Sequence, residues 1–156
     1  MPPVIYQLEP LVGIVPVRFG MSVQALEDAM PEPSAVFQKV VGGPEVHAYY
    51  QNALQVFLGA QRQVEFIELS RSDEVSAGYL GLDLLQTPAQ EVIEHLSATA
   101  EYDRLAPEQG YTFTFHTLQL ALWRPVIPTS KRSKDGRYFK TVGLGCAGYF
   151  SGAGGE

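Results

Sequence analysis

The feature that most constrains this 156-residue chain is a pattern that occurs twice, about 64 residues apart. Residues 47–58 are echoed by residues 111–122, and each stretch has the alternation of two strands joined by a tight turn. Upstream of each stretch, residues 12–22 resemble residues 77–87. The sequence therefore predicts two copies of one structural unit, over about residues 10–70 and 77–150.

Each copy is expected to contain one helix and a third strand. Ser22 is placed to cap a helix over residues 23–30, which has an apolar stripe. Thr87 is placed to cap the second helix, with Pro88 at its first position and Gln90 completing a capping box. The third strands are predicted over residues 64–69 and 138–144.

These elements predict the fold class. A lone helix on three or four strands buries little apolar surface, so we expect the two sheets to join edge to edge. The expected fold is α+β, with two helix-plus-antiparallel-meander repeats sharing one antiparallel sheet and both helices on one face. With 46% apolar and 18% charged residues, the chain can form the core of a single domain over residues 1–156, and residues 151–156 are expected to be a flexible tail.

A short motif before the first helix resembles a known family. The run Phe19-Gly20-Met21-Ser22, with a helix breaker at Pro31, is similar to the opening of repeats in the beta-lactamase-inhibitory-protein-like superfamily, which includes the small outer-membrane lipoprotein A proteins. The resemblance implies tandem units of one helix on an antiparallel sheet, which bind other proteins and catalyse nothing. This chain departs from those relatives because it has no cysteine pairs and its start lacks an export signal, so the resemblance implies a cytoplasmic, immunity-type protein.

The charge of the chain excludes some classes of partner. It carries 17 acids and 11 bases, a formal charge of −6, which disfavours general binding to nucleic acid or to anionic membranes. No stretch approaches the roughly 18 apolar residues of a membrane span. The lone Cys146 is typical of a reducing compartment. We therefore expect a cytoplasmic protein.

The alternation of the strands predicts one polar sheet face that carries large aromatic side chains. Such residues dominate the energetics of protein interfaces. We therefore expect the partner-binding residues to be Tyr50, Phe57, His116, Gln119 and Trp123, with Lys131 and Arg132 of a basic loop at the rim. The alternative is that the connection over residues 125–137 covers Trp123 or Phe57.

That connection holds four of the eleven bases and one acid. Such a segment is suited to binding a phosphate or an acidic partner. A solvated hairpin tip with a turn at Asp135-Gly136 is the commoner structure, and we favour it here.

The residues that most often carry chemistry are sparse. No spacing among His47, His95 and His116 is typical of a metal site, and no cofactor motif stands in a suitable context. Cys146 is the only thiol, and no residue next to it in sequence is placed to act as its base.

We interpret the chain as a non-enzymatic, cytoplasmic protein-binding module, of the inhibitor or immunity type, with another protein as partner and with no cofactor or metal. Two alternatives stay open. One is a homodimer formed through the aromatic face. The other is a small-ligand-binding protein or hydrolase whose pocket holds Cys146 and a histidine.

Overall fold

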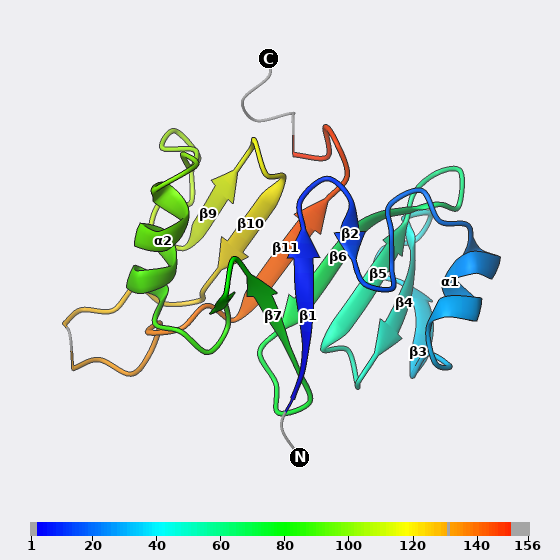
Figure 1. The fold of residues 1–156 in the computed structure, drawn as a ribbon, viewed down its shortest axis with the longest axis horizontal. Coiled ribbons are helices and arrows are strands. Elements are labelled where there is room, and N and C mark those ends of the chain that lie inside the picture. The colour runs from blue at the N-terminus through cyan, green and yellow to red at the C-terminus, as the bar shows by residue number, and fades with distance from the viewer. Residues whose placement is uncertain (1–2, 131, 151–156) are drawn as a thin grey trace.

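The computed structural model describes residues 3–130 and 132–150, and these form two β-sheets and two helices (Figure 1). The predicted α+β class is confirmed. The tail expected over residues 151–156 and the predicted contact residue Lys131 lie outside the described residues.

The larger sheet has seven strands, in the order β3-β4-β5-β6-β11-β10-β9, and every neighbouring pair is antiparallel. Its central pair joins the two halves of the chain, since Ile67 of β6 is opposite Leu144 of β11. The strands are β3 (Ala35–Gln38), β4 (Glu45–Tyr49), β5 (Leu54–Leu58), β6 (Val64–Ser70), β9 (Thr112–Phe115), β10 (Leu120–Trp123) and β11 (Thr141–Gly145).

A second, four-stranded sheet has the order β2-β1-β7-β8, so the prediction that one antiparallel sheet contains all the strands is not confirmed. In this sheet β1 runs parallel to β7, with Val4 opposite Val75, and antiparallel to β2. The strands that precede the two helices, β2 and β7, form their backbone hydrogen bonds with β1 instead of extending the larger sheet. The strands are β1 (Val4–Glu9), β2 (Gly13–Ile14), β7 (Val75–Tyr79) and β8 (Leu82–Asp83).

The helices α1 (Val23–Ala29) and α2 (Ala89–Ser97) lie on the same side of the larger sheet as the small sheet (Figure 1). The predicted cap of α1 is confirmed, because Ser22 Oγ accepts a hydrogen bond from Ala25 N at 3.1 Å. The predicted cap of α2 is wrong. Its N-cap residue is Pro88, which makes no side-chain cap hydrogen bond, and Gln90 bonds to Glu94 instead.

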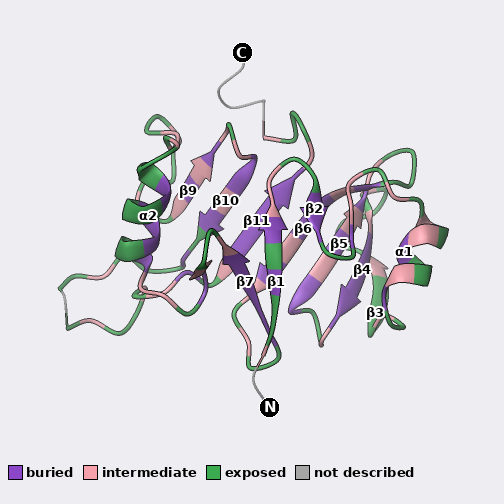
Figure 2. Ribbon diagram, viewed as in Figure 1, coloured by how far each residue is buried: buried purple, intermediate pink, exposed green. Residues whose placement is uncertain are grey.

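One hydrophobic core joins the two helices, the small sheet and the facing side of the larger sheet (Figure 2). Its residues on the larger sheet form cross-strand rows, of which one contains Val56, Ile67, Leu144, Leu120 and Phe115. We call this side of the larger sheet the inner face and the other side the outer face. Neither helix is long and apolar enough to cross a membrane, as judged over the described residues.

Candidate functional site

The outer face of the larger sheet is the candidate site, because the helices and the small sheet all pack on the inner face. Side chains alternate along a strand and cross-strand partners share a face, so the register assigns its members. They form three rows: Phe37, Val46, Phe57, Phe66 and Gly145; then Ala35, Ala48, Gln55, Glu68, Gly143, Ala121 and Thr114; then Ser70, Thr141, Trp123 and Thr112.

Four aromatic rings form a cluster on the outer face, and we call them the aromatic cluster: Phe57, Phe66, Tyr149 and Phe150. Phe66 lies at its centre, stacked on Tyr149 with ring centroids 4.6 Å apart, and it packs edge-on against Phe57 and Phe150 at 5.2 and 5.8 Å. The ammonium group of Lys39 lies 4.9 Å from the centre of the Phe57 ring, a cation–π contact. The aromatic cluster is therefore held together from several sides.

Sequence reasoning missed Phe66, Tyr149 and Phe150. Tyr149 and Phe150 follow a turn after β11 that folds the chain back over its own strand, where Tyr149 N donates to Cys146 O at 3.0 Å. The available signal was the pair Gly143 and Gly145. A Cβ atom at Gly143 would lie 2.6 Å from Phe66 Cζ, and one at Gly145 would lie 2.5 Å from Tyr149 Cβ. The two glycines leave the room that these rings occupy.

Trp123 lies at the end of β10 in the third row and is 39% exposed. It is opposite Thr112 on one side and Thr141 on the other. On β10 and β11, the row between Trp123 and the aromatic cluster contains only small residues, the cross-strand pair Ala121 and Gly143. The connection over residues 125–137 does not bury the indole ring.

The middle row also carries polar groups whose hydrogen-bonding capacity is not used up. Glu68 is half-buried, and its burial raises the pKa of the carboxyl group, although Lys39 at 3.8 Å acts in the opposite direction. The side-chain oxygen of Gln55, its cross-strand neighbour, is buried and has no hydrogen-bond partner in the described residues. A partner that supplies donors here would satisfy both groups.

Two of the predicted partner-binding residues, Phe57 and Trp123, lie on the outer face. The placement of Tyr50, His116 and Gln119 on the strands of that face is wrong, because β4 ends at Tyr49 and all three belong to turns. Tyr50 packs towards the small sheet, where its hydroxyl group lies 2.9 Å from that of Tyr6.

Gln119 is only 6% exposed, and its side chain forms hydrogen bonds within the chain. Its amide group donates to the His116 carbonyl oxygen at 2.7 Å, and its side-chain oxygen accepts from Phe150 N at 2.6 Å. His116 is hydrogen-bonded to Asp103 at 3.0 Å, a contact that lowers the pKa of Asp103. The role of Gln119 in this geometry is to fix the chain that follows β11.

The basic connection begins two residues after Trp123, at the end of β10. It packs beside the start of α2, where Arg137 O accepts from Ala89 N at 2.7 Å and Tyr138 pairs with Pro88. Arg132 is exposed within it. The end of the connection therefore packs on the start of α2, and its place at the rim of a partner contact stays a prediction.

The residues of the alternative, catalytic interpretation are spread out. His47 is buried on the inner face and bonds to Glu45 at 2.7 Å, whereas His116 bonds to Asp103. Burial and the nearby Glu65 raise the pKa of the Cys146 thiol, which disfavours the reactive thiolate. Within the described residues, no three His, Cys, Asp or Glu side chains are grouped to hold a metal ion.

Comparison with known proteins identifies no relative, as no protein-family model, curated protein or solved structure matches the chain.

Proposed function

We propose that this protein is a non-enzymatic protein-binding module of the cytoplasm, of the inhibitor or immunity type, and that it contacts its partner through the outer face. The observation that carries the proposal is the one-sided packing of the larger sheet. Both helices and the small sheet pack on the inner face, while the outer face carries the exposed Trp123 and the aromatic cluster, whose central Phe66 is covered by Tyr149 and Phe150.

The composition of the outer face supports a protein as the partner. Aromatic side chains supply large contact areas at a low cost in side-chain entropy, and they are enriched among the residues that dominate interface energies. The aromatic cluster is already fixed by the contacts among its rings and by Lys39. Binding would therefore cost little further side-chain entropy.

We further propose that the chain consists of two copies of one unit, as its sequence pattern predicts. The residue just before each helix forms a β-bridge with the segment that precedes the last strand of the same half. Ser22 pairs with Gln63 in the first half, and Pro88 pairs with Tyr138 in the second. The last strands, β6 and β11, then pair with each other. This arrangement is what the resemblance to tandem inhibitory proteins implies, and it leaves one continuous outer face.

Trp123→Ala tests the proposed function, and Tyr111→Ala is its matched control. Tyr111 is 41% exposed and Trp123 is 39% exposed. Tyr111 lies just before β9, and the alternation of that strand assigns it to the inner face. A protein captured from the lysate of the source cells should bind the wild-type chain and Tyr111→Ala. With that partner purified, Trp123→Ala should weaken binding by about 2 kcal/mol or more, roughly 30-fold.

Circular dichroism and the melting temperature establish that both variants are folded. Equal affinities of Trp123→Ala and wild type for the partner would overturn the outer face as the contact surface. A mass that increases with concentration, and that Trp123→Ala abolishes, would replace the partner with a second copy of the chain.

A further inference from the structure

A pocket of about 770 Å³ lies between the start of α2 and the connection over residues 125–137, and none of the aromatic cluster lines it. This volume lies in the range of sites for small organic molecules, roughly 300–1,000 Å³. The pocket is lined by Pro88, Gln90, Arg124, Ile127, Pro128, Thr129, Ser130, Ser133 and Arg137. The proposed protein-binding function uses none of these residues.

Arg124 is the unusual member of the lining, because it is only 8% exposed and has no carboxylate partner in the described chain. Its Nε donates to Gly110 O at 2.8 Å and its Nη1 donates to Gly136 O at 3.1 Å. Nη2 makes no hydrogen bond within the part of the chain that the structure describes. A guanidinium group keeps its charge in proteins, so a positive charge is buried here without a counter-ion.

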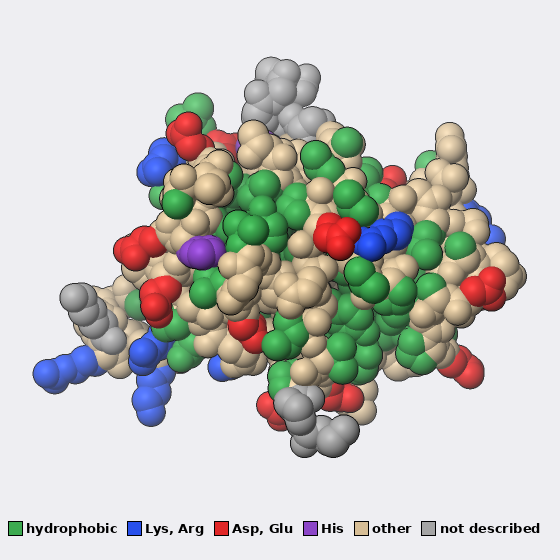
Figure 3. All heavy atoms as spheres, viewed as in Figure 1, with side chains coloured by type: hydrophobic (Ala, Val, Ile, Leu, Met, Phe, Trp, Pro, Cys, Tyr) green, Lys and Arg blue, Asp and Glu red, His purple; other side chains and the backbone are tan. Residues whose placement is uncertain are grey.

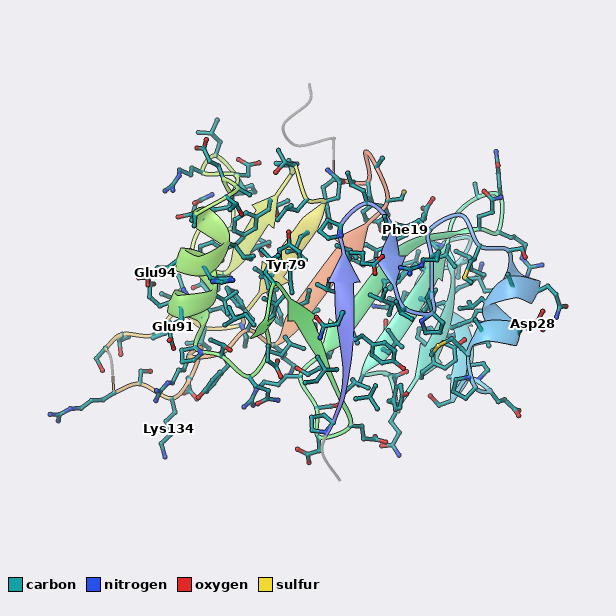
Figure 4. All side chains as sticks on the ribbon, in the orientation of Figure 1. Phe19, Asp28, Tyr79, Glu91, Glu94 and Lys134 are labelled. Carbon is teal, nitrogen blue, oxygen red and sulfur yellow. The ribbon has the colours of Figure 1, made fainter. Side chains whose placement is uncertain are left out.

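The lining of the pocket around Arg124 adds positive charge. Arg137 lines the same pocket, while none of the lining residues is Asp or Glu. The first turn of α2 has no side-chain cap, and its one acid, Glu91, lies outside the pocket lining. Lys134, on the same connection, extends from this end of the molecule, where Lys and Arg side chains gather in the space-filling view (Figures 3 and 4).

The rest of the lining has a different character. Ile127, Pro128 and Pro88 provide an apolar wall, whereas Thr129, Ser130 and Ser133 provide hydroxyl donors. An inorganic anion alone would leave most of the volume unfilled. A ligand with one strongly anionic group and an apolar body uses both parts of the pocket.

We propose that this pocket binds a small phosphorylated organic compound, with its phosphate between Arg124 and Arg137 and its apolar body against Ile127 and Pro128. Nη2 of Arg124 is the donor that remains free for a phosphate oxygen. A phosphate group suits this place better than a carboxylate, because it carries up to two negative charges and offers more acceptor oxygens to two guanidinium groups.

The experiment is a calorimetric titration of the full chain with phenyl phosphate, compared with inorganic phosphate and benzoate. Phenyl phosphate should bind at one site and more tightly than either of the others by about tenfold, because only it supplies both the phosphate and the apolar body. The absence of saturable binding of phenyl phosphate, or equal affinity for benzoate, would overturn the proposal.

Matched arginine variants locate the site. Arg137→Gln should weaken the binding of phenyl phosphate by about tenfold. Arg132→Gln removes the same charge from the same connection but lies outside the pocket lining, so it should change the affinity less than twofold. Equal losses in both variants would mean that the probe is attracted only by the general charge of the connection, which contradicts the proposal.

Arg124→Lys tests the buried guanidinium while keeping a positive charge, with the melting temperature as the check of folding. It should weaken the binding of phenyl phosphate, whereas Phe57→Ala on the outer face should leave that binding unchanged. If Arg124→Lys unfolds the chain, Arg137→Gln decides the question alone. Partner binding that persists in Arg137→Gln separates this pocket from the proposed protein-binding face.

Discussion

The ring of Tyr149 stacks on the ring of Phe66, with centroids 4.6 Å apart and an angle of 9° between the planes. The two residues come from different halves of the chain, and their rings lie where Gly143 and Gly145 leave β11 without side chains. The contact therefore joins β6, β11 and the turn after β11. It also fixes the centre of the outer face, next to the row that contains Glu68.

Gly143→Ala is expected to destabilise the protein although it adds a single methyl group. That group would lie 2.6 Å from Phe66 Cζ and would push the ring away from Tyr149. Crowding of this kind typically costs about 1–3 kcal/mol, which urea denaturation followed by circular dichroism measures. In a Phe66→Leu background the same substitution should cost clearly less, because the shorter side chain leaves room. An equal cost in both backgrounds would show that Phe66 is not the group displaced.

Gln119→Ala is expected to act on stability and not directly on partner binding. The substitution removes a hydrogen bond donated to His116 O and the acceptor of Phe150 N, both in a half-buried place. The loss should be about 1–3 kcal/mol in the free energy of unfolding. Gln119 also has a φ of 52°, a conformation that is strained for any residue with a Cβ atom, so Gln119→Ala keeps the strain and isolates the loss of the side chain. Gln119→Gly relieves this strain as well, and comparing the two variants separates the two effects. A variant of unchanged stability that nevertheless loses its partner would contradict this assignment.

The pH dependence of stability is expected to reveal the burial of Glu68. Burial raises the pKa of this carboxyl group in the folded state, so protonated Glu68 favours folding. The contribution is fully present below the ordinary carboxyl pKa of 4.5 and is lost as the pH rises through the raised value.

Glu68→Gln should therefore stabilise the protein at pH 7 by about 1 kcal/mol and have little effect at pH 3. The sign follows because the attraction of half-exposed Lys39, 3.8 Å away, is weaker than the desolvation cost of burying the Glu68 carboxylate. The net rise of the Glu68 pKa indicates this. Denaturation midpoints at the two pH values provide the test, with the exposed Glu32→Gln as control. A Glu68→Gln variant that is less stable than wild type at pH 7 would rule out this account.

Much of the fold could be predicted from local sequence patterns. The strands of the larger sheet other than β3, and the first helix, follow from alternation, periodicity and capping at Ser22. The strand β3, Ala35–Gln38, was not predicted. The small sheet could not be predicted in this way, because β1 pairs with a parallel strand far along the chain, Val4 with Val75. Nothing in a short window specifies a partner at that distance.

The outer face was predicted in part, and the limit lies in the turns. The sequence suggests tight turns, but the chain leaves β4 after Tyr49 and re-enters at Leu54, and it leaves β9 after Phe115 and re-enters at Leu120. Several turn residues other than glycine have positive φ angles, among them Tyr50 at 53° and Gln119 at 52°, and their side chains carry little signal for that conformation. These two therefore left the predicted face, while Phe57 and Trp123 stayed on it because their strands kept the expected alternation.

The helix caps offer a direct test of where the sequence and the structure differ. Both Ser22 and Thr87 stand before a helix and have the side chain of a capping residue, but only Ser22 makes the bond, from Ala25 N to its Oγ at 3.1 Å. Ser22→Ala should lower the free energy of unfolding by about 1 kcal/mol. Thr87→Ala should change it by less than about 0.5 kcal/mol, since α2 begins after Pro88 and receives no cap from a side chain. Equal losses in the two variants, measured by urea denaturation under one set of conditions, would mean that Thr87 caps α2 in solution. Because Ala89 N already donates to Arg137 O, a further cap from Thr87 would leave still less of this first turn open to an anion.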